Sequence, residues 1–71
     1  MRKFEIETIF ETHSESHFVR MKKEANKIFE EKKKEFETNE EIQKISLNLV
    51  TLKDEEIIKE PLERVERKVK E

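Results

Sequence analysis

The apolar residues of this chain never occur more than two in a row. A membrane-spanning helix needs about 20 consecutive apolar residues, so the pattern excludes one. The apolar residues instead recur singly, with a period of two in some segments and of three to four in others. These periods are typical of strands with one buried face and of amphipathic helices. The sequence therefore predicts a small α+β domain.

Composition removes several classes of function. Charged residues make up 48% of the 71 residues, yet 18 acidic and 16 basic groups leave a net charge of only −2. So small a charge argues against an acidic DNA mimic and against a generally basic nucleic-acid binder. The absence of cysteine excludes disulfides and thiolate metal sites. The absence of glycine excludes phosphate loops and dinucleotide-binding turns that require it.

The N-terminal segment has the period of a strand. Over residues 3–12, Phe4, Ile6 and Phe10 fall on one side of the alternation. The other side carries glutamates, with Ile9 as its apolar exception. We expect one face of this strand to be buried and the acidic face to be solvated.

Residues 15–37 have helical spacing. Ser14 is a favourable N-cap residue, and Asn39 is the best available residue for a left-handed position after the helix. One apolar stripe follows the expected helix. It comprises Phe18, Met21, Ala25, Ile28, Phe29 and Phe36.

The C-terminal third predicts a hairpin and a further element. Alternation over residues 43–52 and again over 55–60 indicates two strands, with a tight turn at Asp54. Pro61 removes a ladder donor, so the second of these strands either ends there or lies at a sheet edge. The spacing of Leu62, Val65 and Val69 favours a C-terminal helix over residues 61–70. An extended edge strand is the alternative.

These elements together predict one domain, residues 1–71, with β-α-β-β order. The long helix would cover one face of a three-stranded sheet, and the first two strands would run parallel through a crossover. Ile9, Val50, Leu52 and one of Ile57 or Ile58 would then lie on the face that the helix does not cover.

An uncovered apolar face in so small a domain indicates an interaction surface. We therefore expect a non-enzymatic protein-interaction or regulatory module that forms a homodimer or binds another protein. The expected location is the cytoplasm, with no membrane association. The expected interface residues are Ile9, Val50, Leu52, Ile58 and Leu62.

A nucleic-acid-binding module is the principal alternative. Its candidate residues are Arg20, Lys23, Lys27 and Lys34, which share one side of the expected helix. Flanking glutamates and the absence of tyrosine and tryptophan as stacking residues make this role the weaker one. A structural or designed domain without any ligand also stays open.

The sequence offers no catalytic or metal-binding constellation. His13 and His17 are four residues apart, but no third ligand accompanies them. The serines lack a nucleophile motif, and Glu5, Glu7 and Glu11 are expected on the solvated side of a strand. We expect no enzymatic activity, no metal and no cofactor.

Overall fold

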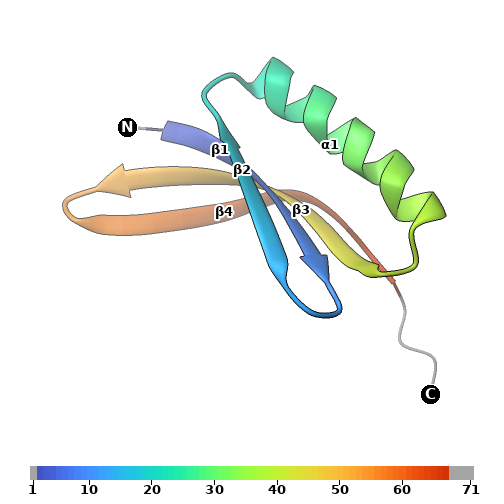
Figure 1. Ribbon diagram of the computed structural model, residues 1–71. Helices are drawn as coiled ribbons and strands as arrows, with labels where there is room; N and C mark the ends of the chain where they lie inside the picture. The colour runs from blue at the N-terminus through green and yellow to red at the C-terminus, as the bar shows by residue number, and fades with distance from the viewer. Residues whose placement is uncertain (1, 68–71) are drawn as a thin grey trace.

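The computed structural model describes residues 2–67, which form one sheet and one helix (Figure 1). Two hairpins flank the helix in the sequence, and all neighbouring strands of the four-stranded sheet are antiparallel, in the order β2-β1-β3-β4. The elements are β1 (Arg2–Phe10), β2 (Ser14–Val19), α1 (Lys22–Thr38), β3 (Ile42–Lys53) and β4 (Glu56–Glu66).

The expected three-stranded β-α-β-β arrangement is wrong. In the sequence, a further strand, β2, comes between β1 and the helix. Both β2 and β3 are antiparallel to β1, so they run in the same direction as each other. The helix connects these two strands across β1. The predicted crossover therefore exists, but it starts from β2, and β1 and β3 are antiparallel neighbours.

The helix begins at Lys22, seven residues later than residue 15, where the sequence predicted it. Ser14, the expected N-cap, is the first residue of β2. The backbone N–H of Phe10 donates to the His13 carbonyl at 2.8 Å and closes the turn between β1 and β2. Met21 is the actual N-cap, and its side chain makes no capping hydrogen bond.

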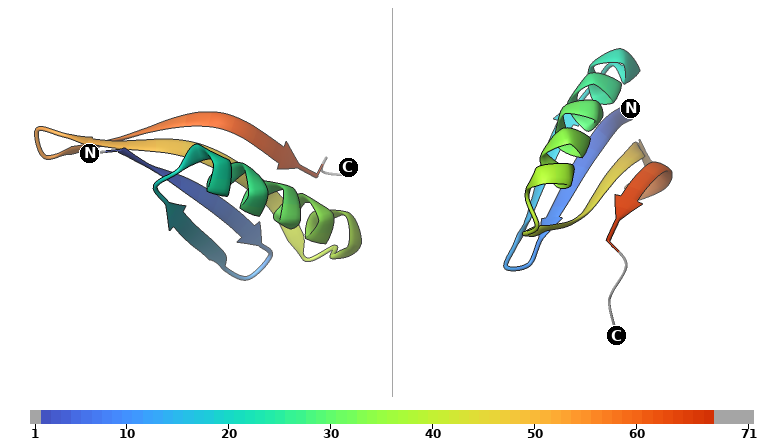
Figure 2. Two further views of the ribbon diagram at one scale, coloured as in Figure 1. Left: turned by 90° about the horizontal axis from the view of Figure 1, so that it is seen from above. Right: turned by 90° about the vertical axis from the view of Figure 1, so that its right-hand side faces the viewer.

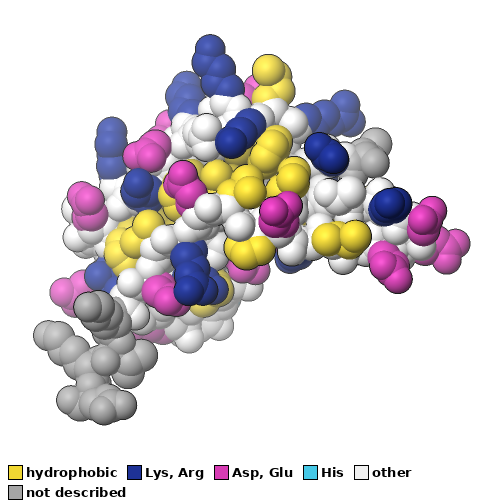
Figure 3. All heavy atoms as spheres, turned by 180° about the vertical axis from the view of Figure 1, so that it is seen from behind, with side chains coloured by type: hydrophobic (Ala, Val, Ile, Leu, Met, Phe, Trp, Pro, Cys, Tyr) yellow, Lys and Arg dark blue, Asp and Glu magenta, His cyan; other side chains and the backbone are white. Residues whose placement is uncertain are grey.

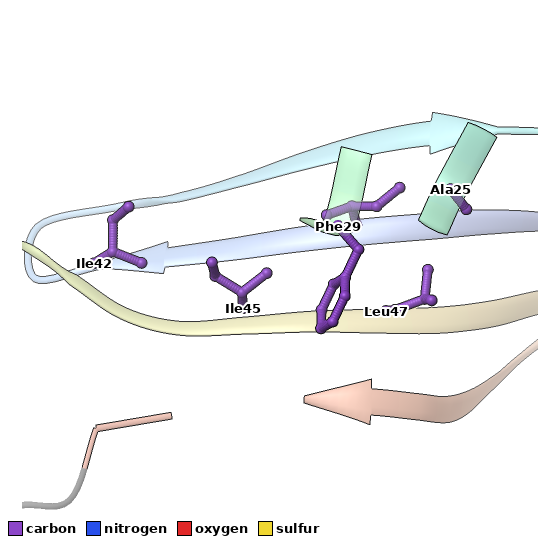
Figure 4. Packing of buried hydrophobic residues seen from close by; sticks show 6 residues of the cluster. Ala25, Phe29, Ile42, Ile45 and Leu47 are labelled. Atoms are coloured by element: carbon purple, nitrogen blue, oxygen red, sulfur yellow. The ribbon is translucent and has the colours of Figure 1, made fainter. Parts of the chain in front are cut away.

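The core lies between α1 and the sheet. Ala25 and Phe29 are the buried residues of the helix, and the Phe29 ring lies between Ile45 and Leu47 of β3 (Figure 4). The small Ala25 side chain lets the helix backbone approach the sheet. Phe18, expected in the same stripe, belongs to β2 and is exposed.

The end of the helix also differs from the prediction. Asn39 has an extended backbone with φ of −114°, so the expected left-handed conformation is wrong. Its N–H donates to the Glu35 carbonyl at 2.7 Å. Its side-chain oxygen accepts from the Glu41 N–H at 3.0 Å. Asn39 thus provides hydrogen-bond partners for the Glu35 carbonyl and the Glu41 N–H at the start of the α1–β3 connection.

Arg67 ties the end of β4 to the end of α1. Its Nε donates to the Ile42 carbonyl at 2.8 Å, and its Nη2 donates to the carbonyls of Asn39, at 2.9 Å, and Phe36. Its guanidinium also lies 4.2 Å from the centroid of the Phe36 ring. The last turn of α1 contains no basic residue, so Arg67 supplies the cation that favours a helix C-terminus.

Residues 56–66 form one strand, β4, so the predicted helix over residues 61–70 is wrong where the structure describes it. The edge-strand alternative agrees with the described residues, whereas Val69 lies outside them. Pro61 is tolerated because β4 lies at the sheet edge. The register shifts here: Leu47 pairs with Glu63 and Asn48 with Pro61, which leaves Leu62 as the extra residue of a bulge.

The β3–β4 hairpin projects beyond the rest of the sheet (Figure 2). Arg2, the first residue of β1, pairs with Thr51, so residues 52–57 have no neighbour from β1. We call these six residues the arm. At its tip Asp54 and Glu55 have φ of 49° and 68°, respectively. The tight turn predicted at Asp54 is confirmed.

Candidate functional site

The sheet face opposite α1 is the candidate site, and we call it the open face. Side chains alternate along each strand, so the paired residues that face away from the helix can be read from the register. At the end nearest the arm they are Lys3 and Glu5 of β1, Phe18 of β2, Asn48, Val50 and Leu52 of β3, and Ile57 and Lys59 of β4.

A pocket of about 340 Å³ lies at this end of the open face. Its lining residues come from all four strands: Lys3, Phe18, Val50, Leu52, Ile57 and Lys59. Phe18, Leu52 and Ile57 are 47%, 52% and 68% exposed, respectively. Val50 is buried. Lys3 Nζ lies 4.5 Å from the centroid of the Phe18 ring, so one lysine is held against the apolar wall.

A buried carboxylate fixes the second lysine. Only 3% of the Glu5 side chain is exposed, and its Oε1 lies 3.1 Å from Lys59 Nζ. The Asn48 amide donates to the same oxygen at 3.0 Å. Burial alone raises the pKa of Glu5, but hydrogen bonds from Asn48, Lys59 and Ser16, with the Lys59 charge, lower the pKa below its ordinary value. Glu5 is therefore a charged anchor that holds Lys59 beside the pocket.

The expectation that Glu5 belongs to a solvated strand face is wrong. Its side chain is buried, and it accepts hydrogen bonds from Asn48 of β3 and Lys59 of β4. The sequence contained one signal for this cluster. Asn48 interrupts an otherwise apolar strand, and a buried amide requires a hydrogen-bond partner.

The five expected interface residues do not all lie together. Val50 and Leu52 line the pocket. Ile9 is on the same face but pairs with Ser14 and Lys44 at the far end of β1. Ile58 lies opposite Thr51, on the helix side of the sheet, and Leu62 lies at the β4 bulge.

Two apolar residues of the pocket, Phe18 and Ile57, were missing from the predicted interface. Phe18 was placed on the helix, so its position in β2 was not available to the prediction. Ile57 was the alternative to Ile58, and the register selects Ile57 by pairing it with Leu52. In the view from behind Figure 1, hydrophobic side chains gather in the middle of the surface among lysine, arginine, aspartate and glutamate (Figure 3).

The four candidate nucleic-acid residues are not on one helix face. Lys23, Lys27 and Lys34 belong to α1, whereas Arg20 precedes the helix. Arg20 instead joins Arg2 and other residues around a smaller pocket of about 230 Å³. A nucleic-acid role therefore loses the continuous stripe on which it was based, and it stays a prediction.

The two histidines are in different elements. His13 lies in the β1–β2 loop and stacks on Phe10, with ring centroids 4.5 Å apart. His17 belongs to β2. Within residues 2–67 there is no cluster of three or more histidine, aspartate or glutamate side chains that could hold a metal ion. The single helix in that range is not long and apolar enough to cross a membrane.

No protein-family model, curated protein or solved structure matches this chain. The geometry of the open face is therefore the basis for assigning a role.

Proposed function

We propose that the protein is a small non-enzymatic interaction module that associates with a second copy of itself through the open face. The observation that carries this proposal is the pocket. Three apolar residues that line it, Phe18, Leu52 and Ile57, are each about half exposed or more. Large apolar side chains clustered around a concavity are typical of protein-interaction sites. The polar anchor at Glu5 and Lys59 gives the surface a fixed shape before any partner binds.

The arm supports a second copy as the partner. It is a two-stranded segment beyond the last pair with β1, and such a segment has little stability of its own in water. It carries Leu52 and Ile57 on the same face as the pocket. When two copies place their open faces together, each arm covers the apolar wall of the other. One patch then serves both partners, as a two-fold symmetric interface requires.

The core is small, so association with a second copy would stabilise the protein. The buried cluster comprises six residues: Ile6, Ala25, Phe29, Ile42, Ile45 and Leu47. A chain of 71 residues buries a smaller fraction of its surface than a larger domain does. Burial of the open face in a dimer adds apolar area that α1 does not supply.

Two adjacent isoleucines provide a matched test. Ile57 faces the pocket, whereas Ile58 pairs with Thr51 on the helix side of the same hairpin. We expect sedimentation velocity between about 5 and 200 μM to show a reversible dimer of the unmodified protein. Ile57→Glu should give a monomer, and Ile58→Glu should keep the dimer.

Circular dichroism establishes that both variants are folded. A monomeric unmodified protein over this concentration range, or equal effects of the two substitutions, would contradict the proposal. A heterologous protein partner and a cytoplasmic location stay predictions.

A further inference from the structure

We infer that the acidic turn at Asp54 and Glu55 of each copy binds beside Lys3 and Lys59 of the other copy, so that the two arms lie antiparallel. This inference rests on the proposed function and adds the arrangement of the two copies. It also names the contacts that select this arrangement.

The spacing along the sheet brings these charges together. Lys3 and Lys59 both pair with Val50, so the two lysines belong to one row across the sheet. Leu52 lies two residues beyond Val50, and Asp54 lies two residues beyond Leu52. Because a strand rises by about 3.3 Å per residue, the lysine row and the turn lie about 7 Å from Leu52, in opposite directions.

A two-fold axis that lies between the two stacked open faces, parallel to the line from Leu52 to its paired residue Ile57, exchanges these two positions. The turn of one copy then lies over the lysine row of the other, and the reciprocal contact forms at the same time. The apolar side chains of the two arms meet at the axis. The interface thus has an apolar centre between two sets of opposite charges, as protein interfaces commonly do.

Charge also disfavours the competing arrangement. If the open faces stacked with the two arms pointing in the same direction, both acidic turns would meet and both lysine rows would meet. Like charges facing each other across an interface lower affinity and suppress that mode of binding. In the antiparallel arrangement, Asp54 and Glu55 face cations instead.

Reversal of single charges tests the inference. Lys3 and Glu55 are exposed, and neither forms an ion pair within residues 2–67, whereas Lys59 must stay to neutralise Glu5. We expect Lys3→Glu and Glu55→Lys each to raise the dimer dissociation constant about tenfold or more at about 20 mM salt. The double variant should return it to within about threefold of the original value.

Lys23→Glu is the control, because it makes the same charge change on α1. It should leave the dissociation constant within about threefold of the unmodified value. Circular dichroism monitors folding. If Lys3→Glu unfolds the chain, Lys3→Gln replaces it, with an expected increase of about threefold.

The outcomes separate the two proposals. The inference is overturned, and the proposed function survives, when Ile57→Glu abolishes the dimer but the charge reversals have no effect or the double variant gives no rescue. A protein that stays monomeric at every concentration overturns both. Rescue by the double variant supports the antiparallel arrangement.

Discussion

Glu5 of β1 and Lys59 of β4 form an ion pair across the intervening strand β3, with 3.1 Å between Oε1 and Nζ. The carboxylate is almost completely buried, whereas the lysine is half exposed. Loss of one member of such a pair is costly because the other charge stays buried without a partner. The pair therefore links β1 to β4 and keeps the Lys59 ammonium at the margin of the pocket.

This pair predicts a specific pH dependence. The pKa of Glu5 is lowered in the folded protein, so the unfolded chain binds the proton more tightly. The stabilising contribution is present above the ordinary glutamate pKa and is lost as the pH falls through the lower folded value. At pH 7 we expect Glu5→Gln to lower the free energy of unfolding by about 1–3 kcal/mol.

Urea denaturation at a series of pH values provides the measurement. The difference between the two proteins should shrink with acidification, because the unmodified protein loses a contribution that the glutamine variant lacks. A difference that stays constant from neutral to acidic pH would disprove this role for Glu5.

Arg67 predicts a large effect from a residue near the end of the described chain. Arg67→Ala removes the hydrogen bonds to Ile42, Asn39 and Phe36, so it should lower the free energy of unfolding by about 2–3 kcal/mol. Arg67→Lys keeps the positive charge but not the planar set of N–H donors. It should therefore recover less than half of the free energy of unfolding that Arg67→Ala loses. Denaturation of the exposed control Arg64→Ala should differ by less than about 0.5 kcal/mol. Equal effects at the two arginines would contradict this role of Arg67.

The turn of the arm predicts a stabilising substitution. Glu55 has φ of 68°, a conformation that costs a residue with a Cβ atom about 1–2 kcal/mol and suits glycine. Part of the gain is offset by the greater freedom of glycine in the unfolded chain, so Glu55→Gly should stabilise the monomer by about 0.5 kcal/mol. Glu56→Gly, one residue later in β4, should destabilise it. Thermal unfolding compares the two variants, and destabilisation by Glu55→Gly would be the contrary result.

Two phenylalanines that the sequence placed in one helical stripe should behave differently. Phe29 is 1% exposed in the core, so Phe29→Ala should cost about 3–5 kcal/mol. Phe18 lines the pocket, and Phe18→Ala should cost less than about 1 kcal/mol in the monomer while weakening the dimer. Denaturation at protein concentrations below the dimer dissociation constant measures the stability of the monomer, and sedimentation measures the strength of the dimer. Similar losses of stability would contradict the assignment of Phe18 to the open face.

The structure explains why the strongly periodic segments were predicted correctly and why β2 was predicted as part of a helix. The alternation of β1 and β3, and the helical spacing from Ala25 to Phe36, follow from buried faces that need apolar residues at fixed intervals. β2 is an edge strand, and its apolar residues are only Phe18 and Val19. Its Ser-Glu start therefore resembled a helix cap, because the same residues suit both positions.

Within the described residues, the helix predicted over residues 61–70 is wrong for a different reason. The bulge at Leu62 inserts one residue into β4, which converts a period of two into a spacing of three between Leu62 and Val65. That spacing matches a helix. Sequence alternation alone does not reveal a bulge, because the bulge depends on pairing with β3.

The candidate site was predictable in part. Val50 and Leu52 follow from the alternation of one strand. Ile57 required the register that the two-residue turn at Asp54 and Glu55 sets, and Phe18 required knowledge of β2. The burial of Glu5 depended on contacts with Asn48 and Lys59, which are more than 40 residues away in the sequence.

The open face is tested most directly by amide chemical shifts measured while the protein is diluted from about 500 to about 10 μM. If two copies associate through this face, the shifts of Phe18, Val50, Leu52 and Ile57 change with concentration, and those of Lys27 on α1 stay constant. Spectra that do not depend on concentration, or changes centred on α1, would contradict association through the open face.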